Sequence, residues 1–148
     1  MIKYRAATMK DFDQVLLLEN ECFIEPYSKK DLLYEFEENP VNKIIVADND
    51  GVIVGFIDFL ITFNSATIMQ IAVTKQFRNL GIATQLLEEM EKSFPEQIDE
   101  KVESITLEVR VSNQPAVKLY TKNGYQIVVV KRGYYKDGEN AIYMIKRL

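Results

Sequence analysis

The sequence contains no histidine and only one cysteine, Cys22. Without histidine, the chain lacks the Ser–His and Cys–His pairs of nucleophilic catalysis and the commonest zinc ligand. A single cysteine excludes a disulfide within the chain and a cysteine-based metal site. Cys22 lies on an apolar helical face, where we expect a small core residue. Any acid–base chemistry therefore falls to aspartate, glutamate, lysine or tyrosine.

Long apolar runs and an excess of positive charge are also missing. No uninterrupted apolar stretch approaches the roughly 20 residues of a membrane-spanning helix, and we expect no signal peptide, because residues 1–5 lead into no apolar segment. The 148 residues carry a net charge of −4 and a pI of about 5.0, which disfavours binding to nucleic acid. Linkers, repeats and low-complexity tracts are not found. We expect a cytoplasmic protein with a single domain over residues 1–148 that binds neither membranes nor nucleic acid.

The first half of the chain alternates between helical and strand patterns. Capping patterns that begin at Thr8 and at Ser28 precede two predicted helices, and Asn39-Pro40 ends the second. A hairpin signal at residues 49–51 and a second turn at residues 64–65 separate the strands that follow. Strands are expected at residues 2–6, 44–47, 52–63 and 67–73.

The second half predicts two helices and three strands. Apolar residues at positions 83, 86, 87, 90 and 94 recur with the helical period until Pro95. Asn113 is the expected N-cap of the last helix, which Asn123-Gly124 ends. Strands are expected at residues 105–109, 125–130 and 141–145. The order βααβββαβαββ predicts an α/β (α+β) fold with a mixed, mostly antiparallel sheet of about seven strands flanked by about four helices.

The segment that joins the third meander strand to the next helix carries the most information. It reads Arg78-Asn79-Leu80-Gly81-Ile82-Ala83. The free N–H groups of a helix N-terminus bind anions, a glycine lets a phosphate approach closely, and Arg78 adds positive charge. The spacing is neither that of a dinucleotide fingerprint nor that of a P-loop. By itself, the segment fits equally well an ordinary strand–loop–helix connection with a surface arginine.

Taken with the order of the elements, this segment resembles the Arg/Gln-x-x-Gly-x-Gly/Ala loop of the GNAT N-acetyltransferase superfamily. Ala83 stands for the second glycine. The resemblance covers essentially the whole chain. Its subgroup of ribosomal-protein-alanine N-acetyltransferases (RimI type) is similar in residues 26–28, 107–113, 116–120, 123–125, 134–135 and 140–142. Tyr27 stands where that subgroup more usually has tryptophan.

The resemblance implies the GNAT fold and acetyl-CoA as the co-substrate, without a metal. It makes Glu108 the proton acceptor and Tyr120 the proton donor. The implied cofactor-binding residues are Ile71, Ala72 and Val73 beside the pantetheine arm, Arg78, Asn79, Leu80, Gly81, Ile82, Ala83 and Thr84 at the pyrophosphate, and Asn113. The implied substrate-binding residues are Pro26, Tyr27, Tyr134 and Tyr135, the last two as a lid over a peptide N-terminus.

The residues themselves constrain this chemistry. Glutamate has an ordinary pKa of about 4.3, so Glu108 needs partial burial or a relaying water to deprotonate an amine whose pKa is about 8. Tyr120, with an ordinary pKa near 10, is a reasonable donor to a leaving thiolate. From spacing alone, Glu108 also fits an exposed strand glutamate, Tyr120 a core tyrosine, and the Tyr134-Tyr135 pair ordinary strand aromatics.

The leading hypothesis is acetyl transfer to the N-terminal α-amine of a protein, with the N-terminal alanine of a small-subunit ribosomal protein as the substrate. The first alternative is acetylation of a small amine or a lysine side chain by the same machinery. The second is a non-catalytic acetyl-CoA sensor, which Glu108 and Tyr120 disfavour. The partner is then a peptide or protein N-terminus, and we expect a monomer or a weak dimer.

Overall fold

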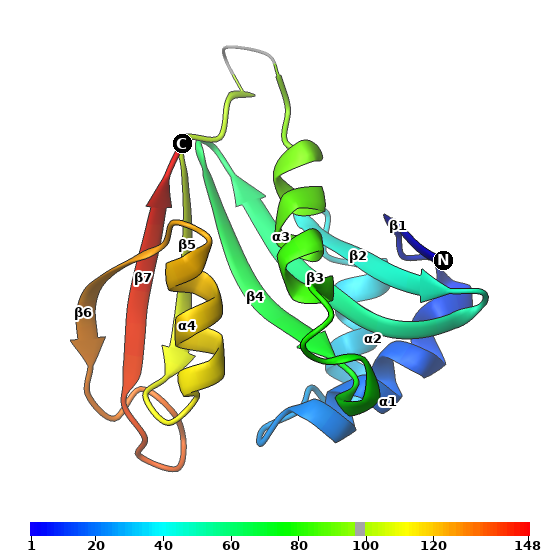
Figure 1. Cartoon of the computed structure of the whole chain (residues 1–148), viewed down its shortest axis with the longest axis horizontal. Helices are drawn as coiled ribbons and strands as arrows, with labels where there is room; N and C mark the ends of the chain where they lie inside the picture. The colour runs from blue at the N-terminus through cyan, green and yellow to red at the C-terminus, as the bar shows by residue number, and fades with distance from the viewer. Residues whose placement is uncertain (97–99) are drawn as a thin grey trace. The chain divides into compact units, whose positions relative to one another are not determined.

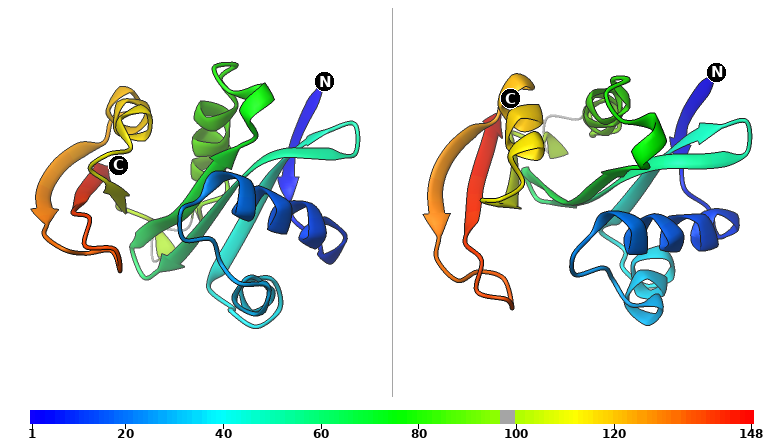
Figure 2. Two further views of the ribbon diagram at one scale, coloured as in Figure 1. Left: turned by 90° about the horizontal axis from the view of Figure 1, so that it is seen from below. Right: turned by 60° about the horizontal axis from the view of Figure 1, so that its bottom comes forward.

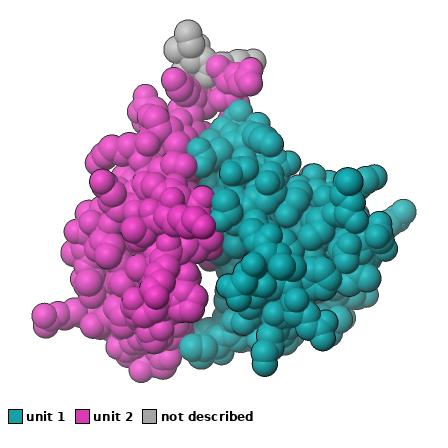
Figure 3. All heavy atoms as spheres, in the orientation of Figure 1, with its two compact units in different colours: residues 1–60, 70–94 teal, residues 61–69, 95–148 magenta. Residues whose placement is uncertain are grey.

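The computed structural model describes residues 1–96 and 100–148, which form two compact units (Figure 3). Unit 1 comprises Met1–Leu60 and Gln70–Phe94, and unit 2 comprises Ile61–Met69 and Pro95–Leu148. In this described part of the chain, no helix is both long enough and apolar enough to cross a membrane.

The order of elements along the chain agrees with the prediction (Figure 1). The strands are β1 (Ile2–Ala6), β2 (Asn42–Asn49), β3 (Val52–Thr62), β4 (Ser65–Val73), β5 (Ser104–Arg110), β6 (Gln126–Lys131) and β7 (Ala141–Arg147). They are hydrogen-bonded in the order β1-β2-β3-β4-β5-β7-β6, which confirms the mixed and mostly antiparallel sheet. The α-helices are α1 (Phe12–Cys22), α2 (Lys29–Glu37), α3 (Ile82–Lys92) and α4 (Gln114–Lys122), and two 3-10 turns lie at Met9–Asp11 and Lys75–Phe77.

Unit 1 is a layered structure in which α1 and α2 cover one face of its strands and α3 covers the other (Figure 2). The capping patterns form as the sequence predicts: the Thr8 N–H donates to Asp11 Oδ2 (2.8 Å), and Ser28 Oγ accepts from the Asp31 N–H (3.1 Å). The buried core between the sheet and the first two helices consists of Phe12, Val15, Leu18, Leu32, Ile44, Val46, Ile53, Phe56 and Ala72.

The close approach of β3 and β4 depends on Gly55. A Cβ atom at this position would lie 2.8 Å from the carbonyl oxygen of Ala72, closer than real Cβ atoms come. Next to this approach, the Thr74 N–H donates to the Val54 carbonyl oxygen (2.8 Å). Glycine is therefore needed here for space.

Unit 2 contains the antiparallel strands β5, β7 and β6. The first three residues of β4 pair in parallel with the first three residues of β5, from Ser65 opposite Ser104 to Thr67 opposite Thr106. Burial alternates along β5, so Leu107 and its neighbours at 105 and 109 are buried while Glu108 lies on the other face. Cross-strand partners share a face, which places Tyr143 of β7 beside Glu108. A β-bulge at Val128 interrupts the register between β6 and β7.

Element boundaries differ from the predictions by a few residues. The turn expected at residues 64–65 lies at Phe63-Asn64, with Phe63 in the left-handed region (φ 52°). Because Ser65 and Ala66 already pair with β5, β4 starts at Ser65 rather than at residue 67. Helix α3 ends at Lys92, before Pro95, and β2 and β7 are longer than expected because pairing with neighbouring strands extends them.

Substituting Gly55 with alanine should destabilise unit 1 by about 1–3 kcal/mol, because the new methyl group would press against backbone that cannot move aside easily. Urea unfolding followed by circular dichroism measures this change. Val52→Ala, at a 58% exposed position of the same strand, is the matched control and should cost less than about 0.5 kcal/mol. Equal costs for the two variants would contradict the packing argument.

Candidate active site

The loop between β4 and α3 in unit 1 is held by a side chain of its own. The Arg78 Nε–H donates to the Val73 carbonyl oxygen (2.9 Å), which ties the end of β4 to the loop. Asn79 and Gly81 are left-handed (φ 64° and 83°), and the Gln85 N–H donates to the Gly81 carbonyl oxygen (3.0 Å) as α3 begins. A Cβ at Gly81 would meet nothing within 4 Å, so the backbone angle, not space, favours glycine here.

A glutamate from α1 fixes the same loop from the other side. Glu21 accepts hydrogen bonds from the Thr74 hydroxyl (2.9 Å) and from the Lys75 N–H (3.0 Å). These donors, with Lys75 first, lower the pKa of the Glu21 carboxyl. Sequence reasoning missed Glu21, because the spacing of an exposed glutamate on a helix does not predict a contact with residues more than 50 positions later.

The predicted phosphate-binding residues of unit 1 differ in what their side chains offer. Asn79 and Leu80 are exposed, whereas the Ile82 side chain is buried in the core. The backbone N–H groups of the first turn of α3 are therefore what Ile82, Ala83 and Thr84 can offer to an anion. The Arg78 guanidinium donates to a backbone carbonyl oxygen, and its Nη2 lies 3.7 Å from Cys22 Sγ. Arg78 therefore holds the conformation of the loop in addition to giving it a positive charge.

The predicted substrate loop at Pro26 and Tyr27 is held by a buried carboxylate. Glu19 is fully buried, and its Oε1 accepts from the Tyr27 N–H (2.8 Å) and from Gln70 Nε2 (3.0 Å). Burial raises the pKa of Glu19. The Tyr27 ring packs against the core of unit 1, and burial raises its pKa. Glu19 lies four residues after Val15 on the buried face of α1, a signal that sequence reasoning did not use.

Asp58 of β3 is a second fully buried carboxylate of unit 1. Burial, reinforced by the charge of Glu35, raises the pKa of Asp58 to about 8, so the group is mostly neutral at pH 7. The amide of Asn42 limits that rise. The Asn42 Nδ2–H donates to the Glu35 carbonyl oxygen (3.3 Å).

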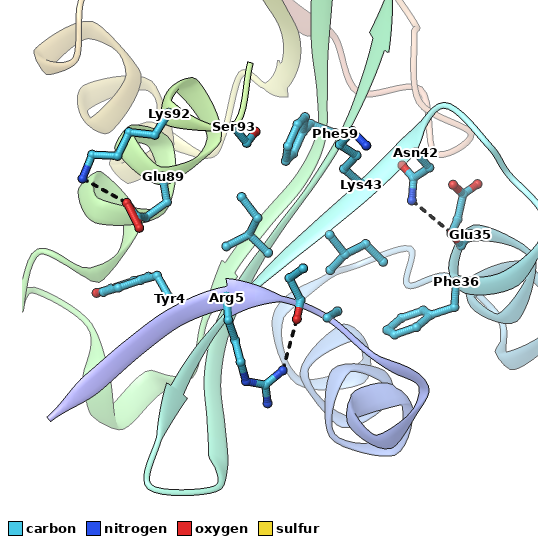
Figure 4. A pocket seen from close by; sticks show the side chains of 14 residues that line it. Tyr4, Arg5, Glu35, Phe36, Asn42, Lys43, Phe59, Glu89, Lys92 and Ser93 are labelled. Carbon is cyan, nitrogen blue, oxygen red and sulfur yellow. Dashed lines mark hydrogen bonds and ion pairs between the residues drawn. The ribbon is translucent and has the colours of Figure 1, made fainter. Parts of the chain in front are cut away.

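A pocket of about 490 Å³ lies elsewhere in unit 1 (Figure 4). Its walls come from β1, β2, β3 and the last turns of α2 and α3, and they combine apolar side chains such as Ile44 and Phe59 with the Glu89–Lys92 ion pair (3.1 Å). None of the predicted site residues is among the residues that line it. The pocket therefore does not coincide with the site that the sequence predicts.

In unit 2, the predicted base Glu108 is part of an ion pair. Glu108 Oε1 accepts from Lys131 Nζ (2.7 Å), and the carboxylate side chain is 20% exposed. The Lys131 ammonium also lies 4.6 Å from the Tyr143 ring centroid and 5.4 Å from that of Tyr134. Glu108 raises the pKa of Lys131. The structure thus brings Glu108 and Tyr134 to one cation, and sequence reasoning missed Lys131 and Tyr143.

The predicted acid Tyr120 is buried at the end of α4. Its ring centroid lies 5.5 Å from that of Tyr125. Burial raises the pKa of Tyr120 above its ordinary value of 10, so the phenol is a weaker acid than the sequence analysis assumed. The hydroxyl keeps its proton at neutral and mildly alkaline pH, where it can act as a hydrogen-bond donor.

An arginine anchors the loop that carries the predicted lid tyrosines. Arg110 Nη1 donates to Asp137 Oδ2 and to Glu139 Oε1 (both 2.8 Å), and its guanidinium lies 4.0 Å from the Tyr135 ring centroid. Hydrogen bonds from Ser112 and Arg110 lower the pKa of Glu139 to about 2, and burial raises the pKa of Tyr135 to about 12. The loop that carries Tyr134 and Tyr135 is therefore fixed to the end of β5.

Asn113, the remaining predicted cofactor residue, caps α4. Its Oδ1 accepts from the Ala116 N–H (3.3 Å), as the sequence pattern predicts. Within residues 1–96 and 100–148, no group of three or more histidine, cysteine, aspartate or glutamate side chains is arranged to hold a metal ion.

Comparison with known proteins places these features in a family. The model of the acetyltransferase (GNAT) family matches residues 12–125. An uncharacterized N-acetyltransferase of Methanocaldococcus jannaschii is 38% identical over 143 residues, and the alignment covers 97% of this chain and 90% of the relative. An N-alpha-acetyltransferase of Sulfurisphaera tokodaii is 35% identical over 154 residues, and the alignment covers 96% of this chain and 90% of the relative. The structure of a ribosomal-protein-alanine N-acetyltransferase from Escherichia coli superposes with a TM-score of 0.84 at 26% identity, covering 99% of this chain and 94% of its own.

The raised pKa of Asp58 predicts a pH-dependent stability. Because the folded state holds a proton that the unfolded state releases above about pH 3.8, Asp58 makes stability fall as the pH rises from about 4 to 8. Asp58→Asn keeps a side chain of the same shape and removes the titration. The variant should gain about 1 kcal/mol or more over wild type between pH 5 and pH 8, measured by urea unfolding. A pH-independent difference would show that Asp58 is ionised in the fold.

The anchor of the lid loop predicts a second pH effect. Since folding lowers the pKa of Glu139, its stabilising contribution is present above pH 4.5 and is lost as the pH falls toward 2. Arg110→Met should move this pKa from about 2 back toward 4.5, as read by carboxyl NMR titration. Arg132→Met, an exposed arginine next to the loop, should leave it in place. An unchanged Glu139 titration in Arg110→Met is the contrary result.

Proposed function

Because the chain belongs to the acetyltransferase (GNAT) family, we propose that it transfers the acetyl group of acetyl-CoA to the N-terminal α-amine of a protein. The proposed substrate is the N-terminal alanine of a ribosomal protein, and the proposed domain spans residues 1–148. Similarity to an N-alpha-acetyltransferase and to a ribosomal-protein-alanine N-acetyltransferase supports this choice of acceptor.

The observation that carries the proposal is the surroundings of Glu108. Its carboxylate already hydrogen-bonds an alkylammonium group, that of Lys131, beside the rings of Tyr134 and Tyr143. A carboxylate with aromatic faces is a favourable environment for a primary ammonium ion, which is the protonated form of the proposed acceptor.

In unit 1, the proposed cofactor groups are backbone atoms. The end of β4 at Ile71, Ala72 and Val73 would pair with the pantetheine arm. The residues from Arg78 to Thr84 would hold the pyrophosphate through the N–H groups at the start of α3. The contacts of Arg78 and Glu21 with residues 73–75 keep these groups in one conformation, which lowers the entropic cost of binding. In unit 2, Asn113 is the proposed cofactor contact.

The reaction needs three things of the protein. Glu108, directly or through water, takes the proton of the ammonium, and the neutral amine attacks the thioester carbonyl. A backbone N–H near Val73 stabilises the developing oxyanion. As the C–S bond breaks, Tyr120 gives its phenolic proton to the thiolate, which leaves as free CoA. The phenolate then takes the second proton that the attacking nitrogen must lose as the amide forms. Tyr134 and Tyr135 would cover the peptide, and Pro26 and Tyr27 would contact its first residue.

Direct transfer is preferred over an acetylated enzyme intermediate. The chain has no histidine to activate a nucleophile, and burial raises the pKa of its one thiol, Cys22. A mostly protonated thiol is a poor nucleophile. The amine therefore attacks acetyl-CoA itself.

The experiment that tests the acceptor is a thiol-release assay with acetyl-CoA. Peptides that start with Ala, Ser, Met or Gly are compared with an N-blocked, lysine-containing peptide and with spermidine. Turnover confined to free N-termini and best with Ala supports the proposal. Turnover only with lysine or spermidine moves the function to small or side-chain amines. Binding of acetyl-CoA without any turnover indicates a sensor.

The acid–base roles predict a specific kinetic pattern. Glu108→Gln and Tyr120→Phe should each lower kcat/KM by about 10²-fold or more, with little change in the Kd for acetyl-CoA. Gly81→Val should instead weaken acetyl-CoA binding, because valine resists the left-handed backbone. Glu88→Gln, at an exposed position of α3, is the control. Unchanged turnover in both acid–base variants would remove the two roles and leave the fold assignment intact.

A further inference from the structure

The ion pair of Glu108 occupies the position where the proposed function needs a substrate. Lys131 Nζ is a primary ammonium 2.7 Å from Glu108 Oε1, and it faces the rings of Tyr143 at 4.6 Å and Tyr134 at 5.4 Å. These three residues, Glu108, Tyr134 and Tyr143, are called the ammonium site below. The side chain that fills it belongs to the same chemical class as the proposed acceptor amine.

The backbone of β6 is built so that Lys131 can reach this site. Lys131 lies opposite Ala141 of β7, and Val129 lies opposite Tyr143. If the register of Gln126 and Ile127 continued unshifted, Val130 would lie opposite Ala141 and Lys131 would point to the other face. The small Ala141 side chain leaves the lysine room to extend diagonally toward Glu108. The bulge therefore aims the ammonium group at the predicted base.

We propose that Lys131 is an internal competitor of the amine substrate: its ammonium occupies the ammonium site and leaves when the substrate amine binds to Glu108. This inference rests on the proposed function, since it takes Glu108 to be the group that meets the acceptor. The exchange replaces one ammonium by another, so the carboxylate stays compensated in both states. The competitor sets the affinity for amines without taking part in the chemistry.

The expected competition is modest. The Lys131 side chain is 40% exposed, and ion pairs of this kind contribute up to about 1 kcal/mol. Removal of the competitor should therefore tighten amine binding by about three- to fivefold. A flexible lysine also regains rotamers and hydration when it leaves, which keeps the exchange easy.

The test uses n-butylammonium, an analogue of both the lysine side chain and a peptide amine. Its Kd is measured by NMR from the ring signals of Tyr134 and Tyr143 in wild type and in Lys131→Met. The variant should bind n-butylammonium about three- to fivefold more tightly. Lys131→Arg, which keeps a cation beside Glu108, should bind as weakly as wild type. Lys136→Met, which removes the same charge at an exposed position of the loop, should also match wild type.

The same variants are then assayed for turnover of an Ala-starting peptide. We expect a lower KM for the peptide in Lys131→Met with kcat nearly unchanged. A fall in kcat with no gain in n-butylammonium affinity would overturn the proposal, because it would mean that Lys131 positions Glu108 rather than competes for it. Tighter n-butylammonium binding without turnover of any peptide N-terminus would keep the ammonium site and reject the proposed function.

Discussion

The approach of two backbones at Gly55 is the constraint on which the cofactor half of the candidate site depends. With no Cβ at this position, β3 comes close to Ala72, and the Thr74 N–H reaches the Val54 carbonyl oxygen. That hydrogen bond holds the residue after β4 against β3. The bonds of Glu21 to Lys75 and of Arg78 to Val73 hold the loop that follows. A glycine without any phosphate-binding role thus supports the strand end from which the proposed phosphate-binding loop begins.

Carboxylates explain how an acidic chain holds its loops. Glu21 accepts a backbone N–H at the β4–α3 loop, Glu19 accepts one from the substrate loop, and Glu139 accepts one at the end of β5. In each case the carboxylate stands in for a missing backbone partner. The net charge of −4 therefore partly reflects carboxylates that hold loops in place, and it is not by itself evidence about the charge of the substrate.

Periodicity and capping patterns were sufficient for the order of the elements, because they depend on local residue spacing. Glu108 and Tyr120 came from a family resemblance, which local chemistry could only qualify. The ion pair of Glu108 could not be predicted from the sequence, since it depends on a bulge at Val128. This residue lies in a run of similar apolar residues, so no sequence signal indicates where the bulge occurs. The raised pKa of Tyr120 was missed for a related reason: burial is a property of the packed fold, not of the spacing along α4.

The Val128 bulge has a second effect, on the tendency of the protein to self-associate. Strand β6 is the last strand of the sheet, and its residues from Ile127 to Val130 are all about half exposed. A regular apolar edge of this kind is a template for strand addition and aggregation. The extra residue twists the edge and breaks the even spacing of its free hydrogen-bonding groups. The irregularity that directs one lysine toward Glu108 thereby also favours colloidal stability at high protein concentration.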